Sequence, residues 1–450
     1  FDAEQLIRLL TKLAKFAQRK RDEQDILNIF VLLGHRHADC NESFAKDRNA
    51  GKDRFVDGSR WLDLGSLSYQ ATLGHQHPRV VASIQAQAAE LCMATPNADF
   101  PAKRQLAQKL LELAPEGFTQ VFFTLGGAEA VENALKVAFD WKAQKVGVDR
   151  VNDGNDLVVL HFRQAFHGRS GYTLSVTNTV PDKIALFPKF DWPRVHNPAI
   201  EFDLEGNICN DIEASEAQAC AEIEAACEKY KNRVAAILIE PLQGEGGDNH
   251  FRTEFFQKLR GYADSEEALL VFDEVQTGFF GSGKPWYWQH HGVRPDVVAF
   301  GKKSQICGVY AGPRVDEVAD NVFVRSSRIN STWGGNLVDM VRSKKFIEII
   351  EEENLADNVA ARGQQLVNGL RGIARDQGHI SNVRGQGSMV AFTLESPGQR
   401  DECIRQMHAR QLLVLASGEQ AIRFRMPLVV TEAEIGQALE RIADCSPAGV

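Results

Sequence analysis

The feature that most constrains this chain is a series of apolar runs of strand length, separated by longer helical segments. Five such runs lie in its central part, at 121–125, 157–162, 234–240, 269–275 and 297–300. Gly, Pro and Asp bound them, and a helical pattern fills residues 128–145. Apolar runs that alternate with helices are typical of parallel strands buried on both faces. We therefore expect an α/β fold built on a mostly parallel central sheet.

The length of 450 residues is too great for a single compact core and suggests two or three domains. Beyond the central runs, a long helical stretch over 341–373 leads into short strands in 383–394 and 421–430. This pattern predicts a separate C-terminal α+β unit. Residues 1–24 have an amphipathic pattern and carry acidic side chains that transit peptides avoid, so we expect a surface helix there.

Composition argues against several classes of protein. Sixty acidic side chains against 51 basic ones give a net charge of −9, which argues against a dedicated nucleic-acid binder. The longest apolar runs, such as 234–239 and 268–272, are far shorter than the ~18–20 residues of a membrane span. The eight cysteines are scattered and form no C-x-x-C pair, so we expect reduced thiols in a cytoplasmic enzyme and no zinc site.

Chemically active side chains follow the apolar runs directly. In open α/β sheets, ligands bind outside the carboxyl ends of the strands. The residues at these positions are Gly126–Ala128, Phe166–Arg169, Glu240, Asp273–Gln276 and Gly301–Lys303. We expect them to meet at one edge of the sheet.

Gly126 and Gly127 separate a strand from a helix. Backbone N–H groups at a helix N-terminus, together with the helix dipole, form an anion site. The same pair is also compatible with a plain strand-to-helix turn, so by itself it is weak evidence for a bound phosphate.

A second glycine motif, at 278–284, fits the G-x-x-x-x-G-K pattern of a phosphate-binding loop. That loop requires Ser or Thr in the next position, to hold magnesium, and then a helix. Pro285 stands there instead; it has no hydroxyl and disfavours helix in the residue before it. The motif therefore does not predict an NTPase.

Asp273 and the pair Lys302–Lys303 suggest a more specific chemistry. Pyridoxal 5'-phosphate requires a lysine that forms a Schiff base, a carboxylate that keeps the pyridine nitrogen protonated, and an anion site for its phosphate. Asp273, Lys302 and Gly127–Ala128 are placed to supply these at the strand ends of one sheet. Taken separately, the aspartate is compatible with helix capping and the lysines with surface charge.

The segments around these residues resemble the class III aminotransferases, a fold-type I family that uses pyridoxal phosphate. The motifs are Glu240-Pro, Phe272–Gly278 and Phe300–Lys303. In that family the ring aspartate and the Schiff-base lysine are commonly 29 residues apart; here 302 − 273 = 29, which favours Lys302 over Lys303. The resemblance covers about 60–440. It is most specific to the branch that acts on the ε-amino group of lysine, through segments 165–179, 187–194, 240–248, 293–303 and 330–336.

The resemblance implies the catalytic roles. Lys302 is expected to form the Schiff base and to shuttle the proton, while Asp273 pairs with the pyridinium nitrogen. Gln276 is expected to contact the oxygen of the ring hydroxyl.

The resemblance also implies how the cofactor is held. Gly127 and Ala128 are expected to bind its phosphate through backbone N–H groups, and Phe166 to stack on its ring, although core packing is an alternative for this phenylalanine. Thr332 is expected to reach the phosphate from the partner subunit of a homodimer. Many relatives have Ser-Gly-Ala where this chain has Gly126–Ala128, so one hydroxyl contact to the phosphate is absent here.

Four further residues are implied as substrate contacts. Arg169 is expected to hold the α-carboxylate of lysine and the distal carboxylate of 2-oxoglutarate, because arginine binds carboxylates in a bidentate manner. Arg423 is expected to hold the proximal carboxylate of 2-oxoglutarate, and Glu245 to neutralise Arg423 when lysine is bound. Asn330 is a candidate contact for the α-amino group of lysine. For Arg425 we expect a structural ion pair.

The implied activity is transfer of the ε-amino group of L-lysine to 2-oxoglutarate, giving 2-aminoadipate 6-semialdehyde, which cyclises to piperideine-6-carboxylate, and L-glutamate. Two alternatives remain: a relative that acts on ornithine, 4-aminobutyrate or another ω-amine, and a non-catalytic binding or regulatory protein with the same fold. The expected organisation is a large cofactor domain at 100–340, with residues 1–99 and 341–450 forming a small domain. No role is assigned to residues 1–55.

Overall fold

The computed structural model describes residues 52–54, 59–94, 98–334 and 336–445. The surface helix expected in residues 1–24 lies outside them. Contacts divide the chain into two units, and nearly all described residues belong to the unit formed by 45–54 and 60–450.

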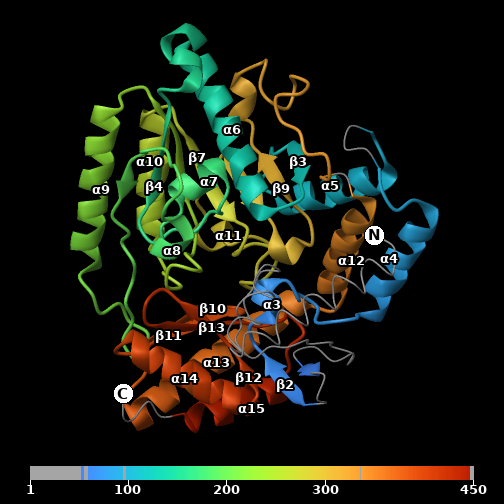
Figure 1. The fold of residues 1–450 in the computed structure, drawn as a ribbon, viewed down its shortest axis with the longest axis vertical. Helices are drawn as coiled ribbons and strands as arrows, with labels where there is room; N and C mark the ends of the chain where they lie inside the picture. Colours follow the sequence, from blue (N-terminus) through green and yellow to red (C-terminus); the bar gives the residue numbers. More distant parts are fainter. Residues whose placement is uncertain (1–51, 55–58, 95–97, 335, 446–450) are drawn as a thin grey trace, which may run out of the picture. The chain divides into compact units, whose positions relative to one another are not determined.

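A seven-stranded sheet forms the centre of the fold, in the order β3-β9-β8-β7-β6-β4-β5 (Figure 1). Its strands are β3 (Gln120–Thr124), β4 (Val158–Phe162), β5 (Arg194–Val195), β6 (Val234–Ile239), β7 (Leu269–Glu274), β8 (Val297–Phe300) and β9 (Cys307–Ala311). Strand β9 runs antiparallel to both of its neighbours, β3 and β8, and the other strands share one direction. The mostly parallel sheet is thus confirmed, and all five apolar runs are strands of it. The sequence analysis did not identify β9, which separates β3 from β8.

Helices cover both faces of this sheet. On one face α6 (Gly127–Val146) shares a buried core with alternate strand residues, such as Val159 and Leu238. On the other face α9 (Ile212–Lys229) and α10 (Thr253–Ser265) pack against the intervening residues, such as Leu160 and Ile237. This double coverage explains why the strands read as continuous apolar runs.

Short elements complete this part of the chain. The helices are α3 (Ser66–Tyr69), α4 (Pro78–Glu90), α5 (Pro101–Leu113), α7 (Gly171–Val176), α8 (Pro181–Ile184) and α11 (Trp288–His291). Single 3-10 turns span Val148–Arg150, Asn152–Gly154, Lys302–Ser304 and Val315–Glu317. Within the described ranges, no helix has the length and apolar character required to cross a lipid bilayer.

The long helix expected over 341–373 is two helices, α12 (Leu337–Glu352) and α13 (Leu355–Gln377). Asn354 lies between them in the left-handed conformation, with φ of 51°. Asparagine tolerates this conformation better than most residues, which lets the chain change direction there. As a result α12 packs beside α4 and α5, whereas α13 packs on the C-terminal sheet (Figure 1).

The C-terminal part has its own antiparallel sheet, in the order β10-β11-β14-β13. Its strands are β10 (Ser381–Gln386), β11 (Met389–Thr393), β14 (Ala421–Arg425) and β13 (Leu415–Ser417), and α14 (Pro397–Ala409) and α15 (Glu432–Ala443) accompany them. A third sheet joins β1 (Lys52–Arg54), β2 (Arg60–Asp63) and β12 (Leu412–Leu413). Leu62 and Leu64 belong to the same core as the C-terminal strands. The domain boundaries at 99 and 340 remain predictions.

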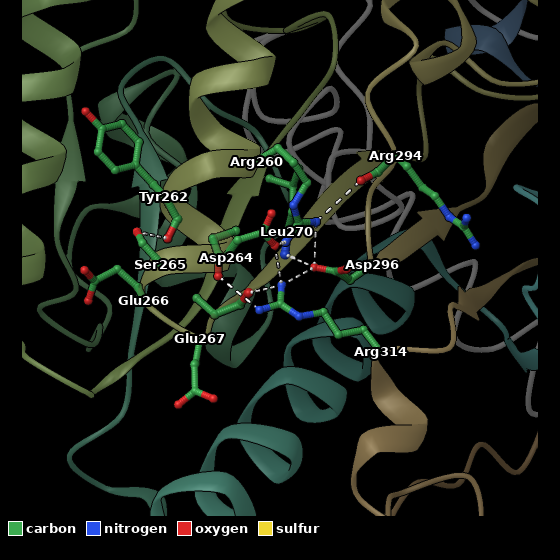
Figure 2. Close-up of polar contacts among 12 residues, drawn as sticks. Arg260, Tyr262, Asp264, Ser265, Glu266, Glu267, Leu270, Arg294, Asp296 and Arg314 are labelled. Atoms are coloured by element: carbon green, nitrogen blue, oxygen red, sulfur yellow. Dashed lines mark hydrogen bonds and ion pairs between the residues drawn. The ribbon is translucent and has the colours of Figure 1, made fainter.

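A group of charged residues joins the elements at the amino edge of the central sheet (Figure 2). Arg260 on α10 and Arg314 beyond β9 both contact Oδ2 of Asp296, at 2.9 and 3.2 Å. The same oxygen accepts a hydrogen bond of 2.8 Å from the backbone N–H of Leu270 at the start of β7. This cluster fixes the register of β7 and β8, whose other ends carry the candidate site.

Candidate active site

A cavity of about 560 Å³ opens at the carboxyl edge of the central sheet. Most of the predicted site residues line it: Gly127, Ala128, Phe166, Arg169, Asp273, Gln276 and Lys302. They come from the ends of β3, β4, β7 and β8, as the strand-end argument predicted. Residues from distant parts of the sequence, including Gln70, Gln305, Cys307 and Arg342, complete the lining.

The N-terminus of α6 forms one end of this cavity. Gly126 is its N-cap residue and makes no side-chain capping bond. The first backbone N–H groups of a helix have no intrahelical acceptor, so those of Gly127 and Ala128 are available to an anion. A Cβ atom on Gly127 would lie 2.7 Å from Cγ1 of Val275, so the loop needs glycine at this position. The arrangement is that of a phosphate site built from backbone.

Asp273 presents a fixed carboxylate to the cavity. It is 3% exposed; its Oδ2 lies 2.8 Å from Nδ1 of His167, and its Oδ1 accepts a hydrogen bond of 3.0 Å from the N–H of Val275. Two partners on one carboxylate restrict its rotation. The sequence analysis assigned no role to His167, although its place directly after Phe166 in the strand-end motif was the available signal.

Lys302 lies in a 3-10 turn directly after β8, with φ of 52°. A non-glycine residue in this conformation is strained, and such strain is common at functional sites. Burial and, next, the positive charge of Arg423 lower the pKa of its amine to about 8, although Asp273 and Glu240 oppose this shift. A substantial fraction of the amine is therefore neutral near physiological pH and able to act as a nucleophile.

Glu240 is a further residue whose role the sequence did not reveal. Its Oε1 accepts a bond of 2.9 Å from the N–H of Phe166, and its Oε2 one of 3.1 Å from Gly244. Burial raises the pKa of this carboxyl to about 7, although the charge of His167 opposes the shift. Glu240 thus connects the loop that carries Phe166, which lines the cavity, to the loop that follows β6.

Two arginines of β14 converge on Gln276. Its Oε1 accepts hydrogen bonds from Nη2 of Arg425 at 2.8 Å and from Nη1 of Arg423 at 3.4 Å. Arg425 also makes a buried ion pair of 2.5 Å with Asp248, which confirms the structural role expected for it. Within the part of the chain that the structure describes, Arg423 makes no such pair and its buried Nε has no hydrogen-bond partner; burial and the charge of Arg425 lower its pKa to about 10. An incompletely paired guanidinium of this kind is a candidate anion site.

Glu245 forms an ion pair with Lys183 of α8 in this structure. From the sequence, Glu245 is expected to neutralise Arg423 only when lysine is bound, and that expectation remains a prediction. The ammonium of Lys183 also lies 5.4 Å from the centre of the Phe166 ring. The sequence analysis gave no role to Lys183, because nothing in the local pattern of α8 distinguishes it from a surface lysine.

Asn330 and Thr332 do not line the cavity of their own chain. Both are exposed, and the Oδ1 of Asn330 accepts a hydrogen bond from the neighbouring N–H of Ser331 at 2.9 Å. The expected contact of Asn330 with the α-amino group of lysine therefore remains a prediction. The role of Thr332 concerns a partner subunit and remains a prediction.

The glycine motif at 278–284 forms a buried loop and not a phosphate-binding loop. Phe279 and Phe280 are 1% and 5% exposed and have positive φ values. The amine of Lys284 donates to the backbone oxygen of Gln289 at 3.0 Å. The lysine is thus engaged in a local contact, as the argument from Pro285 suggested.

Comparison with known families matches residues 44–445 to the aminotransferase class III family. The chain belongs to the class III aminotransferases. It is 46% identical to an L-lysine-epsilon aminotransferase of Amycolatopsis lactamdurans, over 86% of this chain and 88% of that protein. It is 33% identical to the human mitochondrial 4-aminobutyrate aminotransferase, over 83% of this chain and 78% of that protein. Among solved structures, it is similar to the lysine aminotransferase from M. tuberculosis in the internal aldimine form, with a TM-score of 0.86 and 40% identity over 92% of this chain and 97% of that one.

The cofactor of class III aminotransferases is pyridoxal 5'-phosphate, and the cavity fits it. The N-terminus of α6, with glycine where a Cβ would collide with Val275, suits the phosphate. Asp273, held by His167, suits the ring nitrogen, and Lys302 is the amine that the aldehyde requires. When bound, this cofactor supplies an electron sink for negative charge on the carbon next to the reacting nitrogen.

Proposed function

We propose that this class III aminotransferase transfers the ε-amino group of L-lysine to 2-oxoglutarate. The products are 2-aminoadipate 6-semialdehyde, which cyclises to piperideine-6-carboxylate, and L-glutamate. The 46% identity to an L-lysine-epsilon aminotransferase supports lysine as the donor, whereas the identity to the 4-aminobutyrate enzyme is lower, at 33%.

The unequal placement of two arginines carries the proposal. Nη1 of Arg423 lies 3.4 Å from Oε1 of Gln276, which lines the cavity together with Lys302, and the positive charge of this arginine lowers the pKa of Lys302. Arg169 is exposed, at the rim of the cavity. A donor that reacts through its ε-amine has its carboxylate at the far end of the molecule, which suits Arg169. A 2-oxo dicarboxylate has a carboxylate at each end and suits both arginines.

The chain's own residues then have distinct tasks. Lys302 Nζ takes a proton from the ε-carbon of the donor and later returns one to the α-carbon that becomes glutamate. Asp273 holds the proton on the ring nitrogen, and His167 keeps the carboxylate in place. Gln276 links the ring side of the cavity to Arg423 and Arg425.

We further propose that the enzyme is a cytoplasmic homodimer. The exposure of Thr332, which has no place in the cavity of its own chain, supports a contribution to the site of a partner. The seven cysteines in the described ranges are free thiols, which suits a reducing compartment.

Steady-state kinetics with alternative donors test the substrate. With 2-oxoglutarate as acceptor and glutamate as the measured product, kcat/KM for L-lysine is expected to exceed that for ornithine and for 4-aminobutyrate by at least about tenfold. A higher kcat/KM for ornithine or for 4-aminobutyrate would show that lysine is not the preferred donor, and the family assignment would still hold.

A further inference from the structure

Lys183 places a cation in the substrate region where the sequence gave no reason to expect one. It lies on α8, pairs with Glu245, and has its ammonium 5.4 Å from the centre of the Phe166 ring. The two side chains of the pair are only 21% and 19% exposed. A lysine held by a carboxylate and an aromatic face at this depth is not a freely solvated surface residue.

The backbone of Glu245 is fixed, so only its side chain is free to move. The carbonyl of Glu245 accepts a hydrogen bond of 2.9 Å from the N–H of Gly418, and that of Gly244 accepts one of 2.7 Å from the hydroxyl of Ser417. Both donors lie at the end of β13, which pairs with β14. Glu245 is therefore attached to the same sheet that carries Arg423.

Glu245 lies near two cations, Lys183 and Arg423. Gly244, its neighbour in the chain, packs so closely on the side-chain amide of Gln276 that a Cβ there would collide with Oε1, and this oxygen accepts a hydrogen bond of 3.4 Å from Nη1 of Arg423. The charges of Arg169 and Arg423 also lower the pKa of Lys183, in keeping with this placement. Of these, Arg423 has a buried Nε without a partner, while Lys183 has the carboxylate. Because both cations would be stabilised by the same carboxylate, its position decides which of them remains open to an anion.

We propose that Lys183 is a specificity-determining positioning residue that holds Glu245 away from Arg423 and so keeps Arg423 open to the α-carboxylate of a dicarboxylate substrate. This inference rests on the proposed function, because it assumes that one site serves lysine and 2-oxoglutarate in turn. When lysine is bound, Glu245 leaves Lys183 and neutralises Arg423. The ammonium of Lys183 then faces solvent and the Phe166 ring.

Two variants separate this role from a structural one. Lys183→Met keeps the length and the apolar contact with Phe166 but removes the charge, so Glu245 is expected to turn to Arg423. A dicarboxylate must then displace it, and the dissociation constant of glutarate, an unreactive dicarboxylate, is expected to rise roughly tenfold in calorimetry of the holoenzyme. Lys183→Arg restores the cation and is expected to bind glutarate within about twofold of the parent enzyme. The control Asp182→Asn changes one charge on the same short helix at an exposed site and is expected to leave binding unchanged.

Single half-reactions complete the test. In Lys183→Met, the KM for L-glutamate is expected to rise about tenfold while kcat and the L-lysine half-reaction stay within about twofold. In a Glu245→Gln background, Lys183→Met is expected to leave the dissociation constant of glutarate unchanged, since no carboxylate remains for Lys183 to hold. If Lys183→Met still raised this dissociation constant tenfold in that background, Lys183 would bind the dicarboxylate directly and the proposal would be wrong.

The outcomes also separate this proposal from the proposed function. If the parent enzyme processes lysine and glutamate but Lys183→Met slows both equally, or neither, the positioning role fails and the transaminase stands. If the parent enzyme reacts with neither amino acid, the proposed function itself fails.

Discussion

The two edges of the central sheet use charge in opposite ways. At the amino edge, Asp296 lies between Arg260 and Arg314, and each charged group has an opposite charge as its partner (Figure 2). At the carboxyl edge, Lys302 and Glu240 have pKa values displaced toward neutrality, and the buried Nε of Arg423 has no hydrogen-bond partner among the described residues. At the amino edge Nε of Arg260 is also buried without a hydrogen bond from the described residues, but each charge there has an ion-pair partner and the cluster stabilises the fold. The carboxyl edge keeps its charges incompletely satisfied, so that a cofactor and substrates complete them.

The largest expected effect is on the carboxyl edge. Lys302→Met removes the amine that forms the covalent bond to the cofactor, so kcat is expected to fall by more than about a thousandfold, together with the visible absorbance of the lysine-bound cofactor. Steady-state assays with L-lysine and 2-oxoglutarate measure kcat, and an absorbance spectrum measures the bound cofactor. A variant that retained full turnover would show that the carboxyl edge is not the reacting edge.

The amino edge is expected to respond in stability alone. Asp296→Asn keeps the acceptor for the Leu270 N–H but leaves Arg260 and Arg314 without their buried partner. The free energy of unfolding in urea is expected to fall by about 2–3 kcal/mol, with kcat unchanged for the folded enzyme.

Asp264→Asn is the matched control for that edge. Asp264 contacts the same two arginines, but its side chain is 59% exposed, so the loss is expected to be below about 1 kcal/mol. Equal losses in the two variants would contradict the view that Asp296 is the centre of the cluster.

A smaller effect is expected on the relative rates of the L-lysine and L-glutamate half-reactions at the carboxyl edge. Glu245→Ala removes the carboxylate that neutralises Arg423 when lysine is bound. The L-lysine half-reaction is therefore expected to slow about tenfold more than the L-glutamate half-reaction. Rapid mixing of the holoenzyme with each amino acid alone measures the two rates, and equal slowing would argue against a carboxylate that changes partners.

The smallest effect concerns the pH dependence of stability in the apoprotein. The pKa of Lys302 is about 8 in the folded state against 10.5 for an ordinary lysine, so the charged amine costs stability fully below pH 8. That cost disappears as the pH rises from 8 to 10.5, because the folded state loses its proton first. Lys302→Met is thus expected to stabilise the apoprotein at pH 7 by about 1–2 kcal/mol, since partial exposure screens the charge, and by much less at pH 10. Thermal unfolding of the variant and the parent apoprotein at both pH values measures this difference in stability. A difference that did not change with pH would contradict the lowered pKa of Lys302.

Much of the fold could be predicted because burial on both faces makes a strand visible as an apolar run. The five parallel strands and α6 were predicted in this way. The antiparallel strand β9 was not predicted, because nothing in the sequence of its five residues indicates the direction in which the strand runs. The break at Asn354 was missed because helix periodicity continues on both sides of it.

The candidate site could be predicted as far as its residues follow strands. Asp273, Lys302 and Gly127 do so, and the cavity contains them. His167 and Glu240 act through hydrogen bonds between strand ends, and Lys183, on α8, contacts Glu245 from a distant part of the chain. Contacts of that kind depend on tertiary geometry, which no local pattern records.

The most direct test of the central claim uses the holoenzyme and L-lysine alone, without an acceptor. The account predicts loss of the visible absorbance of the lysine-bound cofactor and formation of about one equivalent of 2-aminoadipate 6-semialdehyde per active site, trapped as its cyclised product or with an aldehyde reagent. Formation of a 2-oxo acid from the α-amine, or no change of absorbance with intact lysine, would contradict it.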